Sequence, residues 1–166
     1  MTEVDPTAQE YVRFDSEAEF QSALDRLLAR PGRELRMFDP DMADLKLNSA
    51  ARIDLLRQFL LASATRRVYM AVHDPDHLAR YCPRMMNLIA QFGHVIAIHR
   101  THDEIRELRD SFLVIDKQHY LRRPLARSFR GAIGINDEAE ALTMHARFME
   151  IWAASFPALS GTTLGL

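Results

Sequence analysis

The chain has 166 residues, of which 48% are apolar and 27% charged, and its formal net charge is −2. This size and composition are typical of one domain with a buried core. No apolar run reaches the roughly 18 residues of a membrane span, and the acidic N-terminus lacks the apolar segment of a signal peptide. The lone Cys82 cannot form an internal disulfide, so we expect a cytoplasmic protein.

The first hundred residues alternate between strand and helix patterns. An edge strand at 11–14 precedes a helix capped by Asp15 or Ser16, with Glu19 placed as in a capping box. Asn48 or Ser49 caps a second helix, and Pro83 interrupts a third helical region. Further strands are predicted at 34–38, 66–72 and 94–99. Such alternation predicts parallel strands with right-handed crossovers.

From Ser111 the pattern changes to closely spaced apolar runs, SFLVID, HYLRRP and FRGAIGIN, which indicate paired strands at one side of the sheet. A last helix begins at Asp137, and its wide apolar face should bury Trp152 against the sheet. The predicted fold is α/β, with a mixed, mainly parallel sheet and helices on both faces. We expect one domain at 10–156 between tails at 1–9 and 157–166.

The order of these elements, with the aspartate of SFLVID, resembles one half of the phospholipase D-like superfamily over residues 33–155. Active members of that superfamily carry His-x-Lys-x4-Asp, then a small-residue strand with Gly and Asn, then a helix. The aligned positions here are Arg109, Ser111 and Asp116, followed by Gly131, Gly134 and Asn136. Arginine is no nucleophile, and serine has no charge to replace lysine, so the resemblance implies a degenerate half.

The resemblance also implies what such a site could still do. The planar guanidinium of Arg109 suits a phosphate-bearing anion, although Arg109 could equally pair with Asp110 or Glu107. With Ser111, Asp116, Asn136 and His99 it makes up the predicted ligand-binding set. Because superfamily members pair two motif copies, we also expect a homodimer with Arg109 and Asp116 near its two-fold axis.

Histidines and arginines outside this motif offer further readings. HDPDH at 73–77 and HRTH at 99–102 follow neighbouring strands, but they match no known metal-ligand spacing, so solvated loop residues are the default.

Residues 66–130 hold 12 basic and 7 acidic side chains, a balance of 12 − 7 = +5. This charge could attract an anion or pair with the acidic ends of the chain. The basic cluster of Arg122, Arg123, Arg127 and Arg130 could contact nucleic acid, yet a solvated strand face or a subunit contact fits the slightly negative chain better.

The sequence contains neither a G-x-S-x-G elbow nor a standard nucleotide-binding loop, and we expect no cofactor. The leading hypothesis is a non-catalytic phospholipase D-like domain that binds an anionic ligand or a partner protein. The alternative is a phosphodiesterase or nuclease, metal-dependent or not, that uses the other histidines. Both remain open at the level of the sequence.

Overall fold

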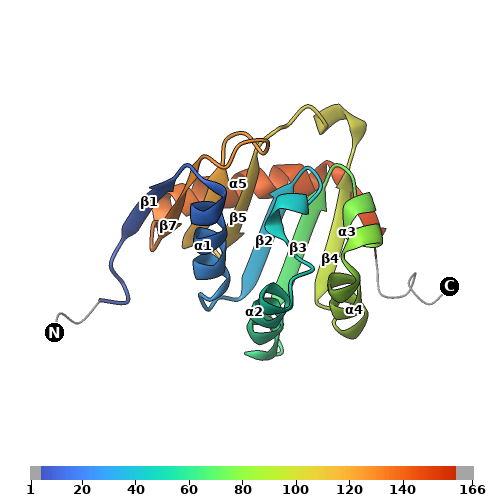
Figure 1. Ribbon diagram of the computed structural model, residues 1–166, viewed down its shortest axis with the longest axis horizontal. Coiled ribbons are helices and arrows are strands. Elements are labelled where there is room, and N and C mark those ends of the chain that lie inside the picture. Colours follow the sequence, from blue (N-terminus) through green and yellow to red (C-terminus); the bar gives the residue numbers. More distant parts are fainter. Residues whose placement is uncertain (1–4, 160–166) are drawn as a thin grey trace.

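The computed structural model describes residues 5–159, which form one eight-stranded sheet covered by helices on both faces (Figure 1). In chain order the strands are β1 (Glu10–Phe14), β2 (Glu34–Asp39), β3 (Arg67–Val72), β4 (Ile96–Thr101), β5 (Ser111–Ile115), β6 (His119–Arg123), β7 (Gly131–Ile135) and β8 (Ser155–Leu159). The α-helices are α1 (Glu17–Leu28), α2 (Ala50–Leu61), α3 (Asp76–Tyr81), α4 (Pro83–Gln91) and α5 (Glu138–Ala153). Two 3-10 turns, η1 (Ala43–Leu45) and η2 (Asp103–Ile105), complete the described elements.

The strand order is β1-β7-β6-β5-β2-β3-β4-β8. Only the β2–β3 and β3–β4 pairs are parallel, and the five other pairs within residues 5–159 are antiparallel. The expectation of a mainly parallel sheet is therefore wrong. Strands β5 to β7 follow one another with short connections, which favour antiparallel pairing. The predicted edge strand β1 and the unpredicted strand β8 both pair antiparallel at the two edges of the sheet.

Helices α1 to α4 cover one face of the sheet, and α5 runs alone across the other (Figure 1). The larger core lies between α1–α4 and the sheet, and includes Phe20, Leu24, Met37 and Met70. A smaller core beneath α5 contains Phe38, Phe112 and Phe148. No helix in residues 5–159 is long and apolar enough to cross a bilayer.

Local signals account for most helix starts. The hydroxyl oxygen of Ser16 accepts a hydrogen bond from the backbone N–H of Glu19 at 3.2 Å, and Ser49 caps α2 in the same way. Pro83 separates α3 from α4, as predicted. Asp137 stands at the N-cap of α5, but its side chain makes no capping bond and instead accepts the Tyr120 hydroxyl at 2.9 Å.

The C-terminal part of the chain departs from the predicted boundaries. Strand β8 pairs with β4 and includes residues 157–159, which the sequence assigned to a tail. The rest of that predicted tail, residues 160–166, lies outside the described residues, as do residues 1–4. Trp152 is half-buried rather than buried, because α5 directs Ala141, Phe148 and Ile151 into the core instead.

Candidate functional site

The candidate site lies at one end of the central strands, where β2 ends and where β5 and the β6–β7 connection begin. Strand β5 is antiparallel to β2, with Phe112 opposite Phe38, so Ser111 starts beside the end of Asp39. Strand β6 pairs with β5 and places Arg123 directly opposite Ser111. The motif position of Ser111 is thereby joined to Asp39 and Arg123, which are far apart in the sequence.

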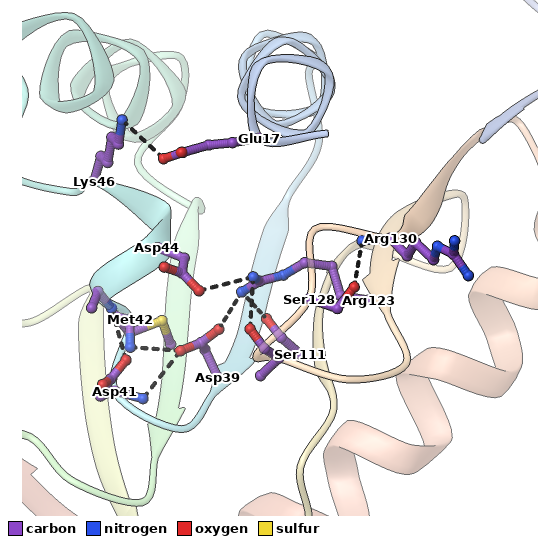
Figure 2. A network of polar contacts seen from close by, with 12 residues as sticks. Glu17, Asp39, Asp41, Met42, Asp44, Lys46, Ser111, Arg123, Ser128 and Arg130 are labelled. Atoms are coloured by element: carbon purple, nitrogen blue, oxygen red, sulfur yellow. Dashed lines mark hydrogen bonds and ion pairs between the residues drawn. The ribbon is translucent and has the colours of Figure 1, made fainter. Parts of the chain in front are cut away.

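A buried ion-pair network fills the floor of this site (Figure 2). The Nη2 of Arg123 donates to Asp39 Oδ2 at 2.9 Å and to Ser111 Oγ at 3.4 Å. Its Nη1 donates to Asp44 Oδ2 and to the Ala126 carbonyl, each at 2.9 Å. The Arg123 side chain is 1% exposed, and its guanidinium carbon lies 4.4 Å from the centre of the Phe20 ring. Arg123 is thus a core residue, which corrects its assignment to a solvated basic face.

Asp39 also organises the loop that borders the site. Its Oδ1 accepts the backbone N–H of Asp41 at 3.1 Å and that of Met42 at 2.7 Å. Met42 is fully buried and has a left-handed backbone, with φ 66°, and Lys46 at the other end of η1 has φ 48°. Such conformations are strained for bulky residues and often occur at functional sites. The bonds from Asp39 hold the loop in that conformation.

Burial raises the pKa of the Asp39 carboxyl, and the Ser111 hydroxyl, the Asp41 and Met42 amides and the Arg123 charge act against that effect. A buried carboxylate of this kind needs all of these partners to stay ionised. The network therefore places a single guanidinium between two carboxylates, those of Asp39 and Asp44, and leaves the buried Nε of Arg123 without an acceptor. It leaves little of Asp39 available to a ligand.

Above the network is a pocket of about 530 Å³. Its charged lining residues are Asp39, Asp41, Asp44, Arg109 and Arg127, and the backbone N–H of Ala126 donates to the Arg109 carbonyl at 2.6 Å. Within residues 5–159, neither Arg109 nor Arg127 has an ion pair or a side-chain hydrogen bond. Asp39 and Asp44 share the one cation of Arg123, whereas Asp41 has no ion pair within residues 5–159, so Arg109 and Arg127 share the pocket with three carboxylates.

Arg109 also borders a second pocket of about 490 Å³ on the α5 side, which it shares with Ser111, Met144 and Arg147. Arg147 there is already bound to Asp110, at 3.0 and 2.7 Å, and this bond raises the pKa of Arg147. The sequence suggested Asp110 or Glu107 as an ion-pair partner of Arg109. Asp110 is not that partner, because it pairs with Arg147. The other acid, Glu107, lines this second pocket together with Arg109, but the two side chains form no ion pair within residues 5–159, so Arg109 borders both pockets as an unpaired cation.

His73 lies close to this site but has no free nitrogen. Its Nε2 is 2.7 Å from the Leu108 carbonyl and its Nδ1 is 2.6 Å from Thr101 Oγ1. A carbonyl only accepts, so Nε2 carries the proton and Nδ1 accepts from the threonine. Burial lowers the pKa of His73, and the nearby charges of Arg109 and Arg106 lower it further. His73 is therefore a neutral, fully bonded core histidine.

The predicted ligand residues do not all meet at this site. Asp116 follows the far end of β5, and at roughly 3.4 Å per residue a five-residue strand separates it from Ser111 by about 17 Å. Its carboxylate accepts the backbone N–H groups of Arg33 and Glu34, at 2.9 to 3.2 Å, and its φ is 53°. Placing Asp116 beside Arg109 is therefore a mistake. Asp116 joins the α1–β2 connection to β5.

Asn136 and His99 also lie apart from Arg109. Asn136 ends β7 at the Asp116 end of the sheet, where its Nδ2 donates to the carbonyls of Pro6 and Ala8 at 2.9 and 3.0 Å. His99 is in the interior of β4 on the α5 face, stacked on Trp152 with ring centres 3.5 Å apart. Its Nδ1 contacts Ser155 Oγ at 2.8 Å, and burial lowers its pKa.

Of the five predicted residues, only Arg109 and Ser111 lie together. Sequence reasoning did not assign Asp39, Asp44 or Arg127 to the site. The spacing of acids in DPDMAD, directly after a buried strand, was the available signal for a loop organised by carboxylates. In residues 5–159 no three His, Cys, Asp or Glu side chains are placed to hold a metal ion together.

A family model described as Domain of unknown function (DUF7931) matches residues 16–160. The chain belongs to this family. No curated protein matches the sequence of this DUF7931 chain.

Among solved structures, the DUF7931 chain is similar to the phospholipase D family member Nuc from Salmonella typhimurium, with TM-score 0.61 and 14% identity. The match covers 92% of this chain and 100% of that one. The archaeal chromatin protein TrmBL2, described as showing a novel mode of DNA binding, matches 94% of this chain and 56% of its own, with TM-score 0.65 and 10% identity. Phosphatidylserine synthase from Haemophilus influenzae gives TM-score 0.59 and 12% identity over 93% of this chain and 41% of its own.

At these identities the comparisons show the fold alone. The DUF7931 chain has the fold of phospholipase D family members, as the resemblance in its sequence implied. The whole of Nuc is spanned by the match, whereas the synthase and the chromatin protein extend well beyond the matched part.

Proposed function

We propose that this chain is a non-catalytic phospholipase D-like domain that binds a phosphate-bearing anion between Arg109 and Arg127. One observation carries the proposal. Arg109 stands at the position that the resemblance gives to the nucleophilic histidine, and it lines a pocket with a second arginine that likewise lacks an ion pair within residues 5–159.

The pocket wall lacks the groups that phosphoryl-transfer chemistry needs. Its lining contains Asp, Pro, Ala, Leu and Arg, and no histidine, cysteine, serine or lysine. Guanidinium does not form a covalent phosphoryl intermediate, and the nearby His73 has both ring nitrogens engaged. The Arg123 network below supports the same view, because it binds the Ser111 hydroxyl and the Asp39 carboxylate to internal partners.

The charge and the geometry of the two arginines favour binding of an anion. Two guanidinium groups on one pocket can each offer paired N–H donors to phosphate oxygens. Arg123 offsets one of the two negative charges of Asp39 and Asp44, which reduces the repulsion of an anion by this pair. The strained loop from Asp39 to Lys46 holds one wall in place before the ligand arrives, which reduces the cost of ordering it.

A nuclease or phosphodiesterase reading remains the alternative, favoured by the fold shared with a phospholipase D family member. The purified protein should leave bis-nitrophenyl phosphate and single-stranded DNA uncut, with and without divalent metal ions. Turnover that is lost in His99→Ala or His73→Ala would overturn the non-catalytic proposal.

The binding proposal has its own test. Titration with inorganic phosphate should shift the backbone amide resonance of Ala126, which is bonded to the Arg109 carbonyl. Arg109→Gln and Arg127→Gln should each weaken binding about ten- to a hundredfold, since a hydrogen bond to a charged group contributes about 1.5–3 kcal/mol. Arg80→Gln on α3 removes the same charge from an exposed position and should change nothing. Equal affinity in all three variants would refute the site.

A further inference from the structure

We propose a second oxyanion site at the opposite end of the sheet, in a pocket of about 220 Å³ between the last turns of α1 and α2. Arg30 and Arg66 line it together with Gln58, Leu55, Phe59 and Gly32. The ligand class that fits is an organic phosphate ester with a compact apolar body. This site is independent of the one at Arg109.

The chain connections place both arginines on this pocket. Arg30 follows the C-cap of α1, and its backbone N–H donates to the Leu27 carbonyl at 2.9 Å. Pro31 and Gly32 then turn the chain into β2, and Gly32 lies so close to β5 that a Cβ there would be 2.2 Å from a methyl carbon of Ile115. Arg66 precedes β3, with its guanidinium carbon 5.7 Å from the centre of the Phe59 ring.

Both arginines have unused hydrogen-bonding capacity. Neither has an ion pair or a side-chain acceptor within residues 5–159, and the Nε atom of each is buried without a partner. A buried donor without an acceptor is destabilising. A small rotation of each planar group would direct Nε and one Nη to two oxygens of a phosphate, which would satisfy these donors.

The surroundings of the pocket are also basic. Arg33, Arg67 and Lys117 lie at the same end of the strands, and the Arg67 amide donates to the Arg33 carbonyl at 2.9 Å. Two acids at this end have partners of their own: Asp116, which keeps its negative charge, accepts the amides of Arg33 and Glu34, and Glu34 is paired with Arg36. The pocket wall adds the apolar surfaces of Leu55 and Phe59, which would contact the body of an ester rather than its phosphate.

Arg30 and Arg66 could instead stabilise the C-terminal ends of α1 and α2 without binding any ligand. The C-terminal ends of α1 and α2 carry partial negative charge, which attracts cations without any ligand. On that view Arg30 and Arg66 stabilise the helix ends, and their loss lowers the melting temperature alone. The proposed site requires in addition that a phosphate ester binds and that binding depends on both guanidinium groups.

The experiment titrates the full chain with phenyl phosphate and follows the amide resonance of Gly32, which lies on the pocket wall. A saturable shift is expected, with weaker binding of inorganic phosphate and no shift with phenol. Arg30→Gln and Arg66→Gln should each weaken binding at least about tenfold. Arg80→Gln should bind as the natural chain does, and Arg109→Gln should keep the Gly32 shift while losing the response of Ala126.

Lysine variants separate a loss of binding from a loss of folding. Arg30→Lys and Arg66→Lys keep the charge at the helix ends but lose the planar fork, and they too should weaken binding. Absence of a saturable Gly32 shift, or a shift that persists unchanged in the Gln and Lys variants, would overturn the proposal. The Ala126 resonance reports binding at the Arg109 site, and the Gly32 resonance reports binding at the Arg30–Arg66 site. Loss of one response therefore refutes one site without refuting the other.

Discussion

At the scale of single residues, Arg123 is the least exposed of the buried arginine and aspartate side chains in residues 5–159, at 1%. Its guanidinium is enclosed, with two carboxylates as ion-pair partners and two aromatic rings, those of Phe20 and Phe129, beside it. Removing one member of a buried ion pair typically costs about 3–5 kcal/mol, because the other charge is left without a partner. An exposed pair contributes about 0–1 kcal/mol. Neighbouring arginines on β6 allow both cases to be compared.

Arg123→Met should therefore lower the free energy of unfolding by about 3–5 kcal/mol, measured by urea denaturation. Arg122→Met is the matched control, since Arg122 pairs with Glu140 at 3.4 Å and its side chain is 38% exposed. It should cost no more than about 1 kcal/mol. Adding Asp39→Asn to Arg123→Met should recover part of the loss. Equal effects of the two arginine variants would show that the network contributes little.

His119 gives the stability of the protein a specific pH dependence. Burial, together with the charge of Arg30, lowers the pKa of His119 to about 4, while its Nδ1 accepts the Asn136 amide at 2.9 Å. Above about pH 6.5 the imidazole is neutral in both the folded and the unfolded chain. As the pH falls below that value, the unfolded chain binds a proton that the folded chain excludes, so the free energy of unfolding falls.

His119→Asn should remove this contribution while keeping an acceptor for the Asn136 amide. Between pH 7 and pH 5, the natural chain should lose about 2 kcal/mol more stability than the variant. His94→Asn, at an exposed position, should retain the pH dependence of the natural chain. Chemical denaturation at several pH values provides the measurement, and parallel profiles for all three proteins would contradict the burial of a neutral His119.

At the scale of elements, α5 is only half engaged by the sheet. Trp152 on this helix packs between the rings of His99 and Phe148, with centres 3.5 and 5.6 Å away, and meets Tyr69 edge-on. Leu142 and Met149 on the same helix are 52% and 43% exposed. The helix is thus apolar over a wider arc than one sheet face can cover.

Trp152→Ala should cost about 2–3 kcal/mol, less than the roughly 3–5 kcal/mol of a fully buried tryptophan, because the ring is half-buried. Met149→Ala on the same helix is the control and should change stability by about 0.5 kcal/mol or less. Thermal unfolding should be followed by circular dichroism in both variants. Trp152 is the only tryptophan, so Trp152→Ala has no tryptophan fluorescence to report on unfolding. An unchanged melting temperature in Trp152→Ala would mean that the stack on His99 contributes nothing.

At the scale of the whole molecule, the two ends of the sheet differ in role. One end holds the strained loop, the buried network and Arg109, and the other holds Asp116, Asn136 and the Arg30–Arg66 pocket. The resemblance implies that two motif copies face each other, and this chain carries one. Asp116 is too distant to offset repulsion between two Arg109 side chains, so a dimer would depend on a bound anion and on the exposed apolar residues of α5.

We expect a homodimer that sediments as such at micromolar concentration and is stabilised by phosphate. Leu142→Glu and Met149→Glu should dissociate it by placing charge in an apolar contact, and Arg109→Glu should remove the effect of phosphate. Leu61→Glu is the control, because Leu61 is 66% exposed but belongs to α2 on the opposite face. A monomer at all concentrations would rule out this mode of pairing.

The sequence by itself determined the local features. Ser16 and Ser49 start helices because their hydroxyls satisfy free backbone amides, Pro83 separates two helices because it lacks a donor, and SFLVID and GAIGIN are strands because apolar runs of that length need burial. These signals involve neighbours within a few residues. The order of these elements was enough to indicate the phospholipase D-like fold.

Only the tertiary structure decided which charges meet. Asp39, Ser111 and Arg123 come together through antiparallel pairing, a long-range choice that no local pattern specifies, and the same pairing sends Asp116 to the far end of β5. The periodicity of the sequence predicted an apolar face on α5. It did not predict how many residues of that face contact the sheet, because the packing of the helix against the sheet decides which residues are covered. Whether an arginine is solvated or buried likewise depends on counter-charges far away in the sequence, as Arg123 and Arg109 show.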